Sequence, residues 1–235
     1  MKLITQQELD AYLENDWVLD LLEEAGKAED KPLATQQWLE QTPAKRLLFS
    51  ALYGDLLDSA PHRRVLDIGG GISTVTRALA HANDYRIVDI LAHGGAAIAA
   101  ALEAELGRKV LTKGDWLRYA EASSDHYDVV VANDIFPNCD QRLELFLEAF
   151  LPRTRELRVS LTFYDRPRYY LCRRLDAEEI LCMLAWDGQQ IENVLSRQRH
   201  AIFNPDFTIF KGDRASVYPN GRHVCLVTFK GGGFA

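Results

Sequence analysis

Three consecutive glycines follow an acidic residue and precede a serine, a spacing typical of a ligand-binding turn. Gly69, Gly70 and Gly71 allow positive φ values and let a ligand approach the main chain without meeting a Cβ atom. Ser73 can cap a helix whose first turn then presents unpaired N–H groups to a carboxylate or a phosphate. Asp67 repels a pyrophosphate but can accept hydrogen bonds from an ammonium group. The pattern therefore indicates a ligand with both an amino and a carboxylate group.

A second acidic residue stands one β-α-β step further along the chain. Residues 85–90 (YRIVDI) predict a strand that ends in Asp89 and Ile90. A carboxylate at this position can accept hydrogen bonds from ribose hydroxyls, and its separation from Asp67 suits neighbouring parallel strands. The alternative is an acidic residue in a surface turn.

Residues 127–132 (YDVVVA) form a continuous apolar run, which is typical of a central parallel strand buried on both faces. Such a strand delivers Asn133 and Asp134 to its carboxyl end, and ligands of open α/β sheets bind at that edge. We therefore expect residues for chemistry here. The alternative is that both side chains only organise a turn before the next helix.

The arrangement of Asp67, Gly69 and Gly71 resembles the first motif of the class I S-adenosylmethionine-dependent methyltransferases, D/E-x-G-x-G. Ser73 stands where many members have a third glycine. The resemblance covers about residues 61–230 and extends to the order of the expected elements. The nicotinamide and flavin fingerprint G-x-G-x-x-G aligns less well, because a threonine occupies its last glycine position.

The resemblance implies S-adenosylmethionine as the cofactor and assigns roles at several strand ends. Asp115 would accept a hydrogen bond from the adenine amino group, and Trp116 would pack on the ring. Asp134 would lie beside the reactive methyl group and contact or deprotonate the acceptor. Tyr164 and His200 are the other catalytic candidates, although a lone histidine beside a strand is often structural. The residues expected to bind the cofactor are Asp67, Gly69, Gly70, Gly71, Ser73, Asp89, Ile90, Asp115, Trp116 and Asn133.

A basic and aromatic segment follows the fifth expected strand, residues 157–163. It contains Arg166, Arg168 and Tyr169, which we expect to bind the substrate. Guanidinium groups beside tyrosines suit a substrate that carries phosphate or carboxylate next to a ring or a sugar. The alternative is a solvated basic loop.

The composition excludes several classes of protein. The chain has 235 residues, 47% of them hydrophobic, which is enough for one large α/β domain. Its formal net charge of −7 opposes binding to polymeric nucleic acid. No C-x-x-C pair occurs, and we expect no metal site, the alternative being magnesium held by Asp134 and Asp165. Because we find neither a signal peptide nor an apolar run of roughly 20 residues, we expect a cytoplasmic protein without a membrane partner.

The expected architecture is an α/β fold: a doubly wound, mostly parallel, seven-stranded Rossmann-like sheet with helices on both faces. Residues 1–60 are expected to form a helical extension, with helices that begin at Thr5, near residues 36–40 and at Thr42. Residues 61–235 form the cofactor-binding domain. In the resembling family such an extension commonly lies over the cofactor pocket as a lid, but the helices could equally pack on the sheet for stability.

The C-terminal part carries two further expectations. A capping-box pattern at residues 176–179 predicts a helix that continues towards Gly188. Two extended segments, residues 200–210 and 222–229, resemble the antiparallel strand pair that closes the sheet beside the fifth strand in this family.

These patterns together predict a methyltransferase that uses S-adenosylmethionine and acts on an oxygen or nitrogen atom of a small molecule. A sugar, a nucleotide-linked compound and an aromatic metabolite are all compatible acceptors. Two alternatives from other classes remain, a nicotinamide-dependent oxidoreductase and a non-catalytic cofactor-binding protein with a methyltransferase fold.

Overall fold

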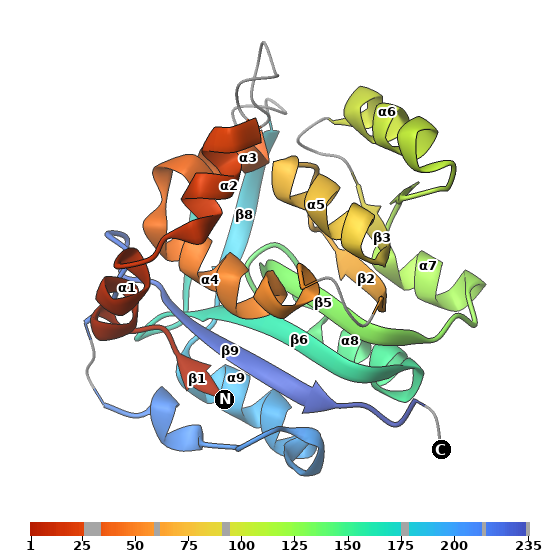
Figure 1. The fold of residues 1–235 in the computed structure, drawn as a ribbon. Coiled ribbons are helices and arrows are strands. Elements are labelled where there is room, and N and C mark those ends of the chain that lie inside the picture. Colours follow the sequence, from red (N-terminus) through yellow and green to blue (C-terminus); the bar gives the residue numbers. More distant parts are fainter. Residues whose placement is uncertain (26–33, 59–61, 91–94, 175–178, 213–214, 234–235) are drawn as a thin grey trace.

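A seven-stranded sheet and a separate two-stranded hairpin organise the molecule (Figure 1). The computed structural model describes residues 1–25, 34–58, 62–90, 95–174, 179–212 and 215–233. The large sheet has the strand order β1-β9-β6-β5-β2-β3-β4, and β7 pairs with β8. The strands are β1 (Lys2–Leu3), β2 (Arg64–Ile68), β3 (Asp84–Asp89), β4 (Leu111–Lys113), β5 (Tyr127–Phe136), β6 (Thr154–Phe163), β7 (Arg168–Arg174), β8 (Glu179–Ala185) and β9 (His223–Lys230).

Helices cover both faces of the large sheet. The α-helices are α1 (Gln6–Leu13), α2 (Trp17–Ala25), α3 (Ala34–Gln41), α4 (Pro43–Tyr53), α5 (Thr74–Ala82), α6 (Ala96–Leu106), α7 (Trp116–Ala122), α8 (Leu143–Phe150) and α9 (Gly188–Arg197). Short 3-10 helices are η2 (Gly54–Leu56), η3 (Leu151–Arg153), η4 (Arg199–Ala201) and η5 (Phe207–Phe210). Figure 1 shows α4 and α5 in front of the sheet and α8 and α9 behind it.

The hydrophobic core has two halves, one on each face of the sheet. Val129 and Val131 of β5 pack with α1, α2 and α4–α6, whereas Val130 and Ala132 of the same strand pack with α7–α9. Strands β2 to β6 run parallel, and β9 pairs antiparallel with β6. The expected mostly parallel, doubly wound sheet of seven strands is therefore confirmed.

The outermost strand is not the expected one. Residues 200–210 form no strand of the large sheet; they contain η4 and η5, and only Ile202 bridges to β9. Asn204 has a φ of 47°, and the proline that follows it has no N–H to donate to a ladder. The N-terminal strand β1 takes this place, with Lys2 opposite Leu226. Part of the extension expected at residues 1–60 is thus built into the sheet.

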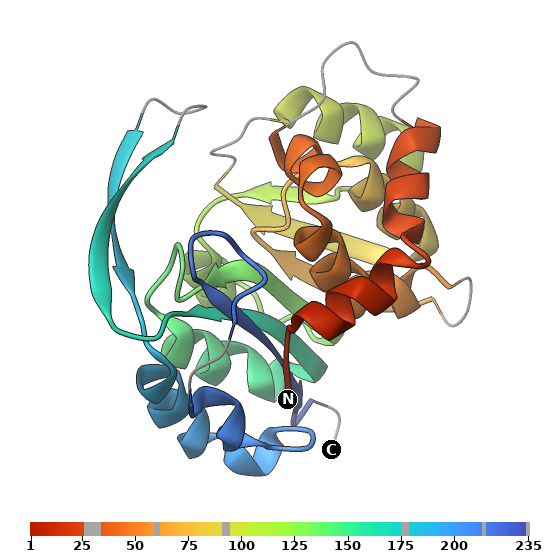
Figure 2. The same cartoon turned by 90° about the vertical axis from the view of Figure 1, so that its left-hand side faces the viewer.

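The helix expected from residue 176 is also wrong. Residues 179–185 form β8, paired antiparallel with β7 in register from Arg168 opposite Ala185 to Arg174 opposite Glu179. The capping-box residues 176–178 lie outside the described residues. The next helix, α9, begins only at Gly188, with the Asp187 carboxylate accepting a hydrogen bond from the Gln190 N–H at 2.8 Å. Figure 2 shows β7 and β8 as a curved ribbon that projects from the body.

The N-terminal helices begin where the sequence predicts. Thr5 and Glu8 form the expected capping box of α1, and Pro43 occupies the first turn of α4 after Thr42. The first expected helix is interrupted at residues 14–16, so that α1 and α2 are separate.

Candidate functional site

A cavity of about 310 Å³ lies at the carboxyl edge of the parallel strands. Its floor comes from the ends of β2, β3 and β5, and residues of α3 and α4 form a wall. Its size is in the range of sites for small ligands. Predicted site residues that line it are Gly69, Gly70, Gly71, Ser73, Asp89, Asn133 and Asp134.

The glycine loop has the geometry that the sequence predicts. Gly69 and Gly71 have φ values of 68° and 64°, a region that favours glycine. A Cβ atom on Gly69 would lie 2.3 Å from Cδ1 of Ile135, a side chain that also lines the cavity. Ser73 is the N-cap of α5, and its Oγ accepts a hydrogen bond from the Thr76 N–H at 3.3 Å. Ser73 itself lines the cavity, whereas the N–H of Thr74, the first residue of α5, donates to Gln36 Oε1 of α3 at 3.3 Å.

Asp67 lies beneath this loop and not in the cavity. The hydroxyl of Tyr53 donates to its Oδ1 at 3.1 Å, and the hydroxyl of Tyr85 donates to its Oδ2. A Cβ atom on Gly70 would lie 2.1 Å from Oδ2, so the carboxylate sits directly under the main chain. Burial raises the pKa of Asp67 to about 7, against the opposing effect of both tyrosine hydrogen bonds. Because both oxygens already accept hydrogen bonds, the expected contact with a ligand ammonium group would have to pass through Tyr53, which lines the cavity.

The end of β5 holds the Asp134 carboxylate firmly. Asp134 has a φ of 58°, and its N–H donates to Ser160 Oγ at 2.8 Å. That same hydroxyl donates to Asn133 Oδ1 at 2.7 Å. The carboxylate Oδ1 accepts hydrogen bonds from Asn138 at 3.1 Å and from Thr162 at 3.3 Å. Asp134 is therefore anchored on several sides before any ligand binds.

Two basic side chains that the sequence analysis did not identify as site residues also line this end of the cavity. Arg222, the residue before β9, donates to both Asp134 oxygens at 3.2 and 3.3 Å. Lys45 of α4 places its Nζ 3.8 Å from Asp134 Oδ2 and 4.5 Å from the centre of the Trp38 ring. Burial lowers the pKa of Lys45, and the charge of Asp134 opposes this effect. Both cations line the cavity, and Asp134 is a carboxylate with two cationic partners.

Asp115 and Trp116 do not line the cavity. The Asp115 carboxylate caps α7 and pairs with Arg142 at 2.7 Å. Trp116 is a core residue: its ring packs edge-on against Phe136 and Phe146, and its Nε1 donates to Asp140 at 2.8 Å. The predicted packing of Trp116 on an adenine ring is wrong, because neighbouring side chains already cover the Trp116 ring. Contact of Asp115 with a ligand stays a prediction.

Ile90 is also outside the cavity lining, at the end of β3. It is exposed, and the residues that follow it at 91–94 lie outside the described part of the chain. A role in cofactor binding therefore stays a prediction for this residue.

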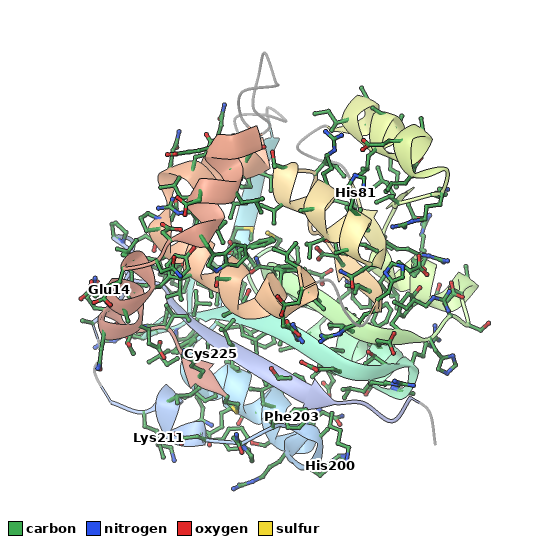
Figure 3. All side chains as sticks on the ribbon, viewed as in Figure 1. Glu14, His81, His200, Phe203, Lys211 and Cys225 are labelled. Atoms are coloured by element: carbon green, nitrogen blue, oxygen red, sulfur yellow. The ribbon has the colours of Figure 1, made fainter. Side chains whose placement is uncertain are left out.

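His200 lies at the wrong edge of the sheet for catalysis. It belongs to η4, and nearby Phe203 donates its N–H to the Thr228 carbonyl at 2.9 Å. Thr228 stands opposite Arg158, in the first half of β6, whereas the cavity lies at the carboxyl edge. Figure 3 labels His200 and Phe203 together below β9. The expectation that His200 acts as a base is therefore corrected.

Tyr164 is buried beside the cavity without lining it. Its N–H donates to the Trp186 carbonyl at 2.8 Å, and the guanidinium of Arg168 lies 4.3 Å from the centre of its ring. It borders a separate hollow with Asp165 and His223, whose side chains pair at 2.9 Å. A catalytic role of Tyr164 stays a prediction.

The residues expected to bind the substrate lie on or next to the β7–β8 hairpin. Arg166 and Arg168 are exposed, and Arg168 donates to the Asn220 carbonyl at 3.3 Å. Tyr169 is 74% exposed and does not line the cavity. The neighbouring Tyr170 hydroxyl donates to Asn138 Oδ1 at 3.3 Å, so the hairpin is anchored at the cavity wall. Substrate binding by the first three residues stays a prediction.

The described residues contain no group of three or more His, Cys, Asp or Glu side chains that could hold a metal ion. In the pair considered for magnesium, Asp134 pairs with Arg222 and Asp165 pairs with His223. In the described part of the chain, no helix has the length and apolar character needed to cross a membrane.

With its sheet order, glycine loop and edge cavity, the chain has the fold of the class I S-adenosylmethionine-dependent methyltransferases. No family model matches the sequence. No curated protein matches it significantly either.

Solved structures do resemble it. Magnesium protoporphyrin IX methyltransferase from Synechocystis PCC 6803, with bound S-adenosylhomocysteine, has a TM-score of 0.51 at 13% identity; the match covers 94% of this chain and 97% of that one. The 1,6-didemethyltoxoflavin-N1-methyltransferase of Burkholderia thailandensis has a TM-score of 0.50 at 16% identity, with coverage of 98% and 92%. An rRNA methylase from Escherichia coli has a TM-score of 0.44 at 16% identity, with coverage of 97% and 77%.

Proposed function

We propose that the protein is a methyltransferase that binds S-adenosylmethionine in the cavity and methylates a small molecule. The observation that carries the proposal is the convergence of the glycine loop, Asp89 and Asp134 on one cavity at the carboxyl edge of the sheet. Gly69, Gly70 and Gly71 line the cavity with their main chain, and Ser73, the N-cap of α5, lines it beside them. Asp89, at the end of β3, is placed to accept hydrogen bonds from ribose hydroxyls.

In this proposal the cavity has two ends. The loop and Asp89 bind the cofactor, and the end of β5 with Asn133 and Asp134 receives the acceptor. The sulfonium of the cofactor supplies an already activated methyl group, so the main task of the chain is to hold the acceptor in line. We assign Asp134 to positioning, because its oxygens are occupied by Arg222, Asn138 and Thr162.

A small acceptor is supported by the cavity volume of about 310 Å³ and by the net charge of −7, which opposes polymeric nucleic acid. We also propose a cytoplasmic location. The exposed thiol of Cys182 supports it, because such thiols persist most readily in a reducing compartment.

We expect the Asp89→Ala variant to bind S-adenosylhomocysteine about tenfold or more weakly than the unchanged protein. The reason is the loss of charge-assisted hydrogen bonds to the ribose, each typically contributing about 1.5–3 kcal/mol. Isothermal titration calorimetry measures the effect. Asp84→Ala is the matched control, since Asp84 begins the same strand and lies 3.6 Å from Arg64 at the opposite edge.

The Asp84→Ala control should bind S-adenosylhomocysteine as tightly as the unchanged protein does. Absence of S-adenosylhomocysteine binding to the unchanged protein, or tighter binding of NADH in the same titration, would reject the proposed function. Equal affinities of the Asp89 and Asp84 variants would reject the ribose assignment alone.

A further inference from the structure

The acceptor end of the cavity has an excess of positive charge. Lys45 and Arg222 both line it, and they share the single carboxylate of Asp134. Asp89, the other acidic residue of the lining, lies at the end of β3, and β2 separates that strand from β5. Two strand spacings put it about 10 Å away. One positive charge at this end is therefore not balanced locally.

Neither cation is fully satisfied by its partner in the described residues. The Arg222 side chain is only 10% exposed, and its Nε is buried with no hydrogen-bond partner among the residues that the structure describes. A buried donor without a partner is unfavourable. The Lys45 ammonium lies 3.8 Å from Asp134, which is longer than a hydrogen bond. An oxygen anion in the cavity would interact with the Lys45 ammonium and with the positive charge of Arg222, since both residues line it.

The surroundings restrict what kind of anion this can be. Leu48, Phe49 and Ile135 also line the cavity, so the body of the ligand meets apolar side chains. A singly charged carboxylate would bring the local charge of Lys45, Arg222 and Asp134 to zero. A phosphate, with up to two charges, would leave an excess negative charge beside apolar walls, which is unfavourable.

We infer that the acceptor is a monocarboxylate with an apolar body, whose carboxylate binds between Lys45 and Arg222. This inference rests on the proposed function and specifies its substrate class. It differs from the expectation that Arg166 and Arg168 bind the substrate, since both residues are exposed beside the hairpin. In the structure Asp134 holds Arg222 in place, and it therefore acts as a positioning residue.

The test uses benzoate as the probe, with benzamide and phenyl phosphate as matched compounds. Each is titrated into the protein saturated with S-adenosylhomocysteine, and ligand-observed NMR gives the dissociation constants. We expect benzoate to bind at least tenfold more tightly than benzamide, because the amide carries no charge, and also more tightly than phenyl phosphate. Equal binding of benzoate and benzamide would overturn the inference, and preference for phenyl phosphate would replace the carboxylate by a phosphate.

Variants link the binding to the two cations. Lys45→Met should weaken benzoate binding about tenfold or more, with the affinity for S-adenosylhomocysteine within twofold of the unchanged value. Lys211→Met, at an exposed position after η5, is the control and should change neither affinity. Arg222→Lys keeps a positive charge near Asp134 but removes the buried Nε, so it should also weaken benzoate binding while circular dichroism remains native.

The two proposals fail in different ways. If S-adenosylhomocysteine binds, but benzoate binds equally tightly to the unchanged protein and to Lys45→Met, the carboxylate inference is wrong and the methyltransferase proposal stands. If S-adenosylhomocysteine does not bind, the proposed function itself is wrong.

Discussion

We expect the Arg158→Met variant to unfold with a free energy about 3 kcal/mol lower than that of the unchanged protein. Arg158 of β6 is buried, and its guanidinium donates to the Leu52 carbonyl and to Asp55 Oδ1, each at 2.6 Å. It thereby ties the end of α4 and η2 to the sheet. Removal leaves the Leu52 carbonyl without its donor and leaves Asp55 with Arg63 alone, and a broken buried ion pair typically costs about 3–5 kcal/mol. The lower end applies here, because the Asp55 side chain is 44% exposed and water partly replaces the arginine.

Urea denaturation at pH 7 measures this loss, and Arg155→Met is the control. Arg155 lies on the same strand, is 62% exposed and pairs with Asp128 at 3.4 Å, so its replacement should cost less than about 1 kcal/mol. A loss for Arg158→Met no larger than that of the control would show that the buried network contributes little.

The ion pair of Arg158 and Asp55 also makes the free energy of unfolding depend on pH. Burial would raise the pKa of Asp55, but hydrogen bonds from Arg158 and Arg63 outweigh this effect and lower it to about 2. A folded-state pKa below the unfolded value of 3.8 stabilises the protein above pH 3.8 and loses that effect as the pH falls towards 2. The stability difference between the unchanged protein and Arg158→Met should therefore shrink over this range.

The second large effect concerns the Asp67→Asn variant, whose stability should respond differently to pH. The folded-state pKa of Asp67, about 7, lies above its ordinary value of 3.8, so the folded protein favours the protonated form. The stabilisation by the protonated carboxyl is complete below pH 3.8 and is lost as the pH rises through 7. Relative to Asp67→Asn, the unchanged protein should lose roughly 2 kcal/mol between pH 5 and pH 7, which is less than the full slope of about 1.4 kcal/mol per pH unit would give, because the folded-state carboxyl is half ionised at pH 7.

Urea denaturation at pH 5, 6, 7 and 8 provides the measurement. Asp20→Asn, at an exposed position of α2, is the control, and its stability should follow the unchanged protein in parallel. A constant difference between the unchanged protein and Asp67→Asn at all four pH values would contradict the raised pKa. The asparagine can still accept one tyrosine hydroxyl, which keeps the loop supported.

The parallel core of the fold could be predicted because its signals are local. The run at residues 127–132 is apolar on both faces of β5, and the glycines after β2 leave few alternatives to a tight turn. Ser73 caps α5 as expected, since a cap depends on neighbours within one helical turn. These same elements position the cofactor half of the candidate site.

The acceptor half could not be predicted in this way. Lys45 lies in a helix of the N-terminal segment, and Arg222 follows a turn near the end of the chain. Only tertiary packing brings Lys45 and Arg222 to Asp134, and no spacing in the sequence predicts this contact. The turn at Asn220 and Gly221 could have indicated the position of Arg222. A strand that begins after this turn and pairs antiparallel with β6 must place its first residue at the carboxyl edge of β6.

The β7–β8 hairpin shows a different limit. A continuous apolar run after acidic residues is compatible with a helix or a strand, and periodicity does not separate the two. Pairing with β7 decides the outcome for residues 179–185. Trp116 illustrates the same limit for a side chain, since its sequence position suited a ligand contact and its packing makes it a core residue.

The pairing of β1 with β9 has a consequence for synthesis of the chain. Lys2 and Leu3 leave the ribosome more than 200 residues ahead of their partners Leu226 and Cys225. Chains grow at about 5–20 residues per second, so the first strand waits many seconds for its neighbour. Until β9 arrives, the outer edge of β6 has no partner in the large sheet, and open strand edges favour association with other chains. The nascent protein is therefore prone to aggregate while β6 has emerged and β9 has not.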